Sequence, residues 1–206
     1  EKHADPNIGK CFHYFRSKQY GEREAWRAHA EGLDVVVVCP GTIIGAGWWD
    51  DEPNSLFREI DNGLMFYTCA TNGFVDVRDV VEIMYRLMVS NISGEKYIVV
   101  ADNKSFKDVI WKMADALSVK RPAIEANAML RAVAWRLAWI QAKVTGKRPL
   151  MTAESAALAS ISFEYNSSKI VNELRYNFIP INKCIEDTAA AYLESKKNNR
   201  YWAVFY

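Results

Sequence analysis

The chain alternates between segments with helical hydrophobic spacing and short runs of β-branched residues. Residues 11–30 predict a helix that Gly32 ends, and the apolar run at residues 34–38 predicts a strand. Because this run is continuous rather than alternating, it is typical of a strand buried on both faces of a parallel sheet. A helix, a tight glycine turn and a buried strand form half of a βαβ unit.

The same alternation continues to about residue 101. It predicts a helix over 55–62, a strand over 65–68, a helix over 77–89 and a strand over 96–101. Beyond that point the pattern predicts mainly helices, one of them over 128–144. The first hundred residues therefore indicate an α/β unit, and the remainder indicates a helical α+β attachment.

Two of these helices carry an apolar stripe that should face a core. In the helix over 77–89 the stripe is Val80, Val81, Met84, Leu87 and Met88. The helix after residue 105 begins at a predicted cap, Ser105. Its stripe is Phe106, Val109, Ile110, Met113 and Leu117.

Composition narrows the class of protein. Half of the 206 residues are hydrophobic, and 26 basic residues against 25 acidic ones leave a net charge of +1, which gives no field for binding nucleic acid. The four cysteines are scattered without zinc spacing, which favours a reduced cytoplasmic compartment and no metal site. The most apolar stretch, residues 128–144, is interrupted by charges, so we expect no membrane span.

Candidate chemistry lies in the first helix, where Tyr14 and Lys18 are four residues apart and share a face. The pKa of a phenol is ordinarily about 10, and a neighbouring cation lowers it by favouring the phenolate. Such a tyrosine can exchange a proton with a substrate oxygen while a cofactor carries hydride. The same lysine can hydrogen-bond a ribose hydroxyl.

The same spacing recurs at Tyr165 and Lys169, but the context differs. Tyr14 lies one helix before a strand that ends at Pro40, and ligands bind at the carboxyl ends of parallel strands. No such strand follows the second pair. We therefore interpret Tyr165 as a packing aromatic and Ser167 or Ser168 as a helix cap.

Four segments carry a family resemblance: YFRSKQYGE (14–22), VVVVCPGTIIGAG (35–47), NGFVDVRDVV (72–81) and FEYNSSKIVNELRYNFIPI (163–181). In this order they resemble the extended short-chain dehydrogenases/reductases, whose active-site helix carries YxxSKxxxE. The resemblance implies the C-terminal part of a Rossmann-like doubly wound parallel sheet with a smaller, mainly helical substrate lobe. It also implies NAD or NADP as cofactor and a secondary alcohol or ketone as substrate.

The resemblance further implies roles for individual residues. Tyr14 would be the catalytic acid/base and Lys18 its partner at the cofactor ribose, while Pro40, Thr42 and Ile43 would lie along the nicotinamide. A wall of aromatic side chains would suit an apolar substrate, with simple hydrophobic cover as the alternative. These aromatic residues are Trp48, Trp49, Phe57 and Phe66.

Two departures from the family pattern matter. The GxxGxxG loop and the catalytic Ser or Thr would precede Glu1, so we expect the chain to be the C-terminal portion of a longer enzyme and inactive alone. Asn72 and Gly73 stand where sugar-nucleotide epimerases carry an Arg-Asp pair. This favours the branch of dihydroflavonol reductases and 3β-hydroxysteroid dehydrogenases. A sugar-nucleotide epimerase or dehydratase, and a non-catalytic Rossmann-like binding or regulatory module, remain alternatives.

The implied organisation interleaves two parts. Residues 1–46 and 70–101 would belong to the nucleotide-binding domain, whereas 47–69 and 102–206 would form the substrate lobe. Arg78-Asp79 is interpreted as a structural helix-start pair. The expected partner is a small-molecule substrate, and homodimer formation is left open.

Overall fold

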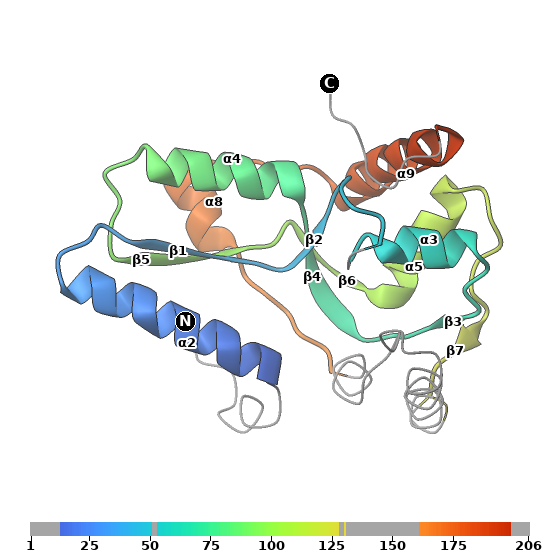
Figure 1. The fold of residues 1–206 in the computed structure, drawn as a ribbon, viewed down its shortest axis with the longest axis horizontal. Coiled ribbons are helices and arrows are strands. Elements are labelled where there is room, and N and C mark those ends of the chain that lie inside the picture. Colours follow the sequence, from blue (N-terminus) through green and yellow to red (C-terminus); the bar gives the residue numbers. More distant parts are fainter. Residues whose placement is uncertain (1–12, 51–52, 128–129, 131–160, 199–206) are drawn as a thin grey trace.

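The computed structural model describes residues 13–50, 53–127, 130 and 161–198, with the side chains of residues 13 and 14 excepted (Figure 1). The helices are α2 (His13–Ala30), α3 (Ser55–Asp61), α4 (Val77–Met88), α5 (Phe106–Ala116), α8 (Ser168–Leu174) and α9 (Ile181–Lys197). The strands are β1 (Val36–Pro40), β2 (Thr42–Ile44), β3 (Phe66–Tyr67), β4 (Thr71–Asp76), β5 (Glu95–Val99), β6 (Asp102–Ser105) and β7 (Ile124–Glu125). Apart from Leu130, the predicted helix over 128–144 lies outside the described residues.

The strands form three small sheets. β1 is parallel to β5, with Val36 opposite Glu95 and Pro40 opposite Val99. β2 is parallel to β4, which also pairs with β6 in the antiparallel sense. β3 pairs in parallel with β7. The predicted α/β class is confirmed, and the parallel pairs place the ends of β1 and β5 together.

Helices cover both faces of the β1–β5 pair (Figure 1). Tyr97 and Val99 of β5 are buried in an apolar cluster with residues of α4 and with Ile170 of α8. Lys96, directly before Tyr97, instead donates to the Glu22 carboxylate of α2 at 2.7 Å. Because successive strand residues point to opposite faces, α2 covers one face and α4 and α8 cover the other. The layers are those of a doubly wound sheet.

A second cluster packs around the other face of β4. Phe74 of β4 lies in it, whereas the adjacent Val75 lies in the first cluster, so β4 joins both. Side chains from α3, α5 and α9 complete this core. The predicted start of α5 is confirmed, because Ser105 Oγ accepts a hydrogen bond from the Asp108 backbone N–H at 3.0 Å.

One prediction about burial was wrong, and a second was right only in part. Residues 36–39 of β1 are half-buried rather than fully buried, because β5 pairs with one edge of β1 and no other described strand pairs with the second. In α4 Val80 and Leu87 are buried as predicted, but the third buried apolar residue is Ile83, and Val81, Met84 and Met88 are exposed. Two neighbouring stripes of this helix have the same three- and four-residue spacing, so periodicity alone could not choose between them.

None of the helices in the described part of the chain is both long and apolar enough to cross a bilayer.

Candidate active site

Two glycines bring the strand ends into backbone contact. The Gly41 N–H donates to the Val99 carbonyl at 3.1 Å, directly after β1 ends. A Cβ on Gly41 would lie 2.5 Å from the carbonyl oxygen of Gly73 and 2.9 Å from a Val100 methyl. Only glycine fits this approach, so β1, β4 and the end of β5 meet at one point.

Replacing Gly41 with Ala is expected to lower the free energy of unfolding by about 1–3 kcal/mol, because the Gly73 carbonyl is backbone and cannot swing away. Gly21→Ala is the matched control. A Cβ there meets nothing within 4 Å, and losing a helical glycine should stabilise by about 0.5–1 kcal/mol. Urea unfolding of the protein expressed from its complete reading frame measures both effects. A Gly41→Ala variant as stable as the wild type would contradict the close contact.

A side-chain amide links β2 to β4 beside this contact. Asn72 Nδ2 donates to Thr42 Oγ1 at 3.0 Å, and the Gly73 N–H donates to Asn72 Oδ1 at 2.9 Å. Thr42 is half-buried and Pro40 is exposed, so both can line a ligand at the strand ends. Ile43 points the other way and packs against the cluster that contains Val75.

The direction of α2 brings the Tyr14–Lys18 end of this helix toward the same point. Glu22 pairs with Lys96, and a Cβ on Gly94 would lie 2.8 Å from His29 Nε2. Moving back along α2 from His29 to Glu22 therefore means moving forward along β5, and the two run antiparallel. Figure 1 shows the start of α2 on the side of the view where β1 ends.

Lys18 is exposed, as are all of residues 15–21 of α2. Tyr14 lies in the first turns of α2, but its side chain is outside the described part of the structure. The roles assigned to both from the sequence stay predictions.

The four aromatic residues expected at the substrate separate into two pairs. Trp49 and Phe57 are 4% and 1% exposed, and both make ring contacts with Tyr192 of α9. This burial favours hydrophobic cover for them. Of the four, Trp48 and Phe66 are exposed and present an aromatic surface.

The segment before α8 packs beside the end of β5. The ring of Tyr165 lies against Gly73, and its backbone exchanges two hydrogen bonds with the Asn103 side chain, at 2.8 and 3.0 Å. Lys169 instead pairs with Glu95, so the interpretation of Tyr165 as a packing aromatic is confirmed. A cavity of about 460 Å³ lies here, lined by residues 100–103 and 165–168 among others.

The predicted cap position of α8 is confirmed at Ser167, although its side chain does not bond to the helix. Ser167 occupies the N-cap position, but its hydroxyl accepts from the Val100 N–H at 2.9 Å instead of from the helix. Asn166 Oδ1 accepts from the Ser168 N–H at 2.8 Å. The backbone N–H that follows β5 needed an acceptor, and Ser167 supplies it.

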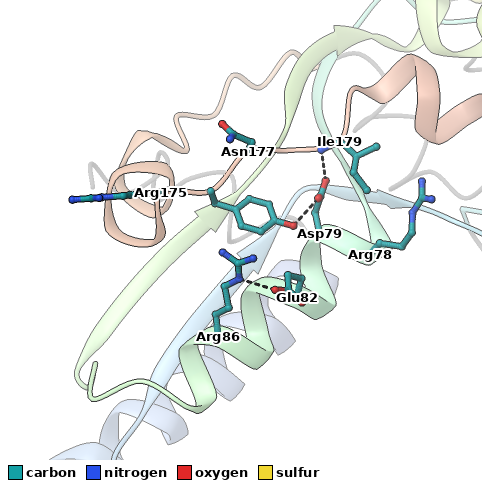
Figure 2. A pocket seen from close by; sticks show the side chains of 8 residues that line it. Arg78, Asp79, Glu82, Arg86, Arg175, Asn177 and Ile179 are labelled. Carbon is teal, nitrogen blue, oxygen red and sulfur yellow. Dashed lines mark hydrogen bonds and ion pairs between the residues drawn. The ribbon is translucent and has the colours of Figure 1, made fainter.

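A second cavity of about 460 Å³ lies between α4 and residues 175–179 (Figure 2). Arg78 pairs with Asp76 and with Asp187 of α9, and Arg86 pairs with Glu82. Figure 2 shows Arg175 pointing away from this group. Most of the charges here are thus paired within the protein, which supports a structural role for the Arg78-Asp79 pair.

Asp79 is the buried centre of the contact between α4 and residues 175–179. Its carboxylate, 1% exposed, accepts from the Tyr176 hydroxyl at 2.8 Å and from the Ile179 N–H at 3.1 Å. Burial raises the pKa of Asp79 above its ordinary value, although both hydrogen bonds oppose that shift. Burial and the bond to Asp79 also raise the pKa of Tyr176.

Comparison with known proteins finds relatives that are similar in sequence and in fold. Over 172 residues the chain is 26% identical to a Synechocystis protein named after dihydroflavonol 4-reductase, covering 78% of this chain and 49% of that protein. Over 84 residues it is 40% identical to tetraketide alpha-pyrone reductase 2 of Arabidopsis thaliana, covering 38% and 26%. The structure of dTDP-glucose 4,6-dehydratase from Bacillus anthracis, in complex with NAD, aligns with a TM-score of 0.67 at 13% identity, covering 93% and 54%. The chain is a relative of the extended short-chain dehydrogenases/reductases.

The resemblance inferred from four segments is thereby confirmed, and so is the Rossmann-like fold. No family model matches the chain. The chain spans about half the length of the Synechocystis protein and about a quarter of that of the Arabidopsis reductase. The structural likeness, at 13% identity, concerns the fold alone.

One residue of the site escaped the sequence reasoning. Asn72 stood out only as a departure from the family pattern, whereas the structure bonds it to Thr42. The two residues are 30 positions apart. No local pattern links residues at that separation, because their contact depends on the pairing of β2 with β4.

Proposed function

We propose that the chain belongs to an NAD(P)-dependent reductase that transfers hydride between nicotinamide and a secondary alcohol or ketone. The observation that carries this proposal is the antiparallel direction of α2 against β5, which directs Tyr14 and Lys18 toward the strand ends at Pro40 and Thr42. Two of the compared relatives are named for reductases, which supports the same chemistry.

The residues at the strand ends suit the nicotinamide half of the cofactor. The glycine contact brings β4 against the ends of β1 and β5, and ligands bind at the carboxyl ends of parallel strands. Pro40 and Thr42 would line the nicotinamide, and Ile43 would contribute through its backbone because its side chain is packed. Bound there, the nicotinamide would supply or accept the hydride.

In this proposal a side chain of the protein supplies the proton. In the direction of reduction, the Tyr14 phenol donates its proton to the substrate oxygen as negative charge develops on it. The ammonium of Lys18, one helical turn away, favours the phenolate that is left and hydrogen-bonds a ribose hydroxyl. Solvent then returns the proton to Tyr14.

The surroundings of Asn72 support a ketone over a sugar nucleotide. Its amide is committed to Thr42 and to the Gly73 N–H, so it is not available as a clamp for a diphosphate. The core that joins Trp49 and Phe57 to α5 and α9 supports assigning residues 47–69 and 102–206 to one substrate lobe. The alternative, an epimerase or dehydratase, has the same fold, as the likeness to dTDP-glucose 4,6-dehydratase shows.

The test is an assay of the protein expressed from its complete reading frame. Oxidation of NADPH and NADH is followed with a dihydroflavonol, a tetraketide alpha-pyrone and a steroid ketone, and dTDP-glucose is offered in parallel with NAD. We expect turnover of at least one ketone and none of the sugar nucleotide. Turnover of dTDP-glucose alone would establish the alternative. Failure to bind either cofactor would leave a non-catalytic module.

A further inference from the structure

The hydrogen bonds around Asn72 determine which way its amide faces. A backbone N–H can only donate, so the atom of Asn72 that lies 2.9 Å from the Gly73 nitrogen is the carbonyl oxygen. The amide nitrogen therefore faces Thr42 Oγ1, 3.0 Å away. Both ends of this short side chain are held, one by its own strand and the other by β2.

This orientation fixes the role of the Thr42 hydroxyl. Its oxygen accepts from Asn72, so its single proton must be directed elsewhere. Within the described part of the chain no group accepts that proton. Thr42 therefore presents an oriented, half-buried donor at the start of β2, two residues after β1 ends.

We infer that Asn72 is a positioning residue that holds the Thr42 hydroxyl as a hydrogen-bond donor to a carbonyl oxygen of the bound ligand. The inference rests on the proposed function. That function brings two carbonyl groups as candidate acceptors: the carboxamide of the nicotinamide and the ketone of the substrate. Both need a donor, and a neutral hydroxyl provides one without adding charge.

Asn72→Asp reverses the direction of the hydrogen bond between residue 72 and Thr42 with almost no change in the shape of the side chain. One carboxylate oxygen still accepts from the Gly73 N–H, but the other now accepts from Thr42, so the hydroxyl proton turns away from the ligand. Asn91→Asp is the matched control, because Asn91 is exposed in the loop between α4 and β5 and the charge change is the same. Thermal melting of each variant checks folding.

Four proteins form a double-mutant cycle: the wild type, Asn72→Asp, Thr42→Val and the double variant. Each single change should weaken the affected step by about 5- to 10-fold, the value of one neutral hydrogen bond. The double variant should be no weaker than Thr42→Val, because Asn72 acts only through the hydroxyl. Thr42→Ser, which keeps the hydroxyl, should retain the wild-type values.

Two readouts distinguish the sources of the carbonyl. If the dissociation constants of NADPH and NADH rise, measured by fluorescence without substrate, the acceptor is the nicotinamide carboxamide. If these constants hold and kcat/KM for the reduced ketone falls, the acceptor is the substrate. Additive losses in the double variant, or no loss in a folded Asn72→Asp protein, would overturn the inference. A wild type that neither binds cofactor nor reduces a ketone would refute the proposed function instead.

Discussion

Replacing Tyr14 with Phe is expected to lower turnover by about 10²–10⁴-fold while cofactor affinity stays nearly unchanged. The substitution removes one hydroxyl and keeps the ring, so the helix and its packing should persist. Without the phenol, no side chain passes the proton to the substrate oxygen, and hydride transfer alone would leave an alkoxide. Steady-state kinetics with the ketone identified in the assay, together with cofactor titration, measure the two quantities.

Tyr20→Phe is the matched control, because it removes a phenol from the same helix. Tyr20 is exposed, and among the described residues its hydroxyl accepts from Arg16 alone, at 3.2 Å. We expect turnover of this variant to equal that of the wild type. If Tyr14→Phe also kept its turnover, the catalytic role of Tyr14 would be refuted.

Replacing Asp79 with Ala is expected to lower the free energy of unfolding by about 3–5 kcal/mol, the value of two buried hydrogen bonds to a charged group. The Tyr176 hydroxyl and the Ile179 N–H would both lose their acceptor. These two bonds tie the first turn of α4 to the connection between α8 and α9, so losing them should loosen the contact between these segments. Urea unfolding of the complete protein measures the change.

Two variants separate this effect from the loss of a charge. Glu82→Ala, on the same helix, breaks an exposed pair with Arg86 and should cost at most about 1 kcal/mol. Asp79→Asn keeps the shape but cannot ionise. Because burial raises the pKa of Asp79, the stability that this group contributes is fully present below its unfolded pKa, about 3.9, and is lost as pH rises through the folded value.

The stability of the wild type relative to Asp79→Asn should therefore fall as the pH is raised. Unfolding curves at several pH values between about 3 and 7 test this sign. A relative stability that rises over this range would show that the two hydrogen bonds outweigh burial. Equal stability of Asp79→Ala and the wild type would show that the contact of α4 with the connection between α8 and α9 does not depend on Asp79.

Local patterns in the sequence determined most of the secondary structure. The long amphipathic stretch ended by Gly32 became α2, and the β-branched run after it became β1, shifted by about two residues. Ser105 capped α5 as predicted, and Phe66–Tyr67 formed a strand. Each of these signals acts within a few residues along the chain, so tertiary contacts were not needed to reveal it.

The tertiary structure decided what those elements bury and which side chains meet. It selected Val80, Ile83 and Leu87 of α4 over the neighbouring stripe, because β5 and α8 supply their partners. It also turned Ser167 from its helix to the Val100 N–H and placed Asn72 against Thr42. These outcomes depend on strands and helices far apart in sequence, whose pairing no local spacing encodes.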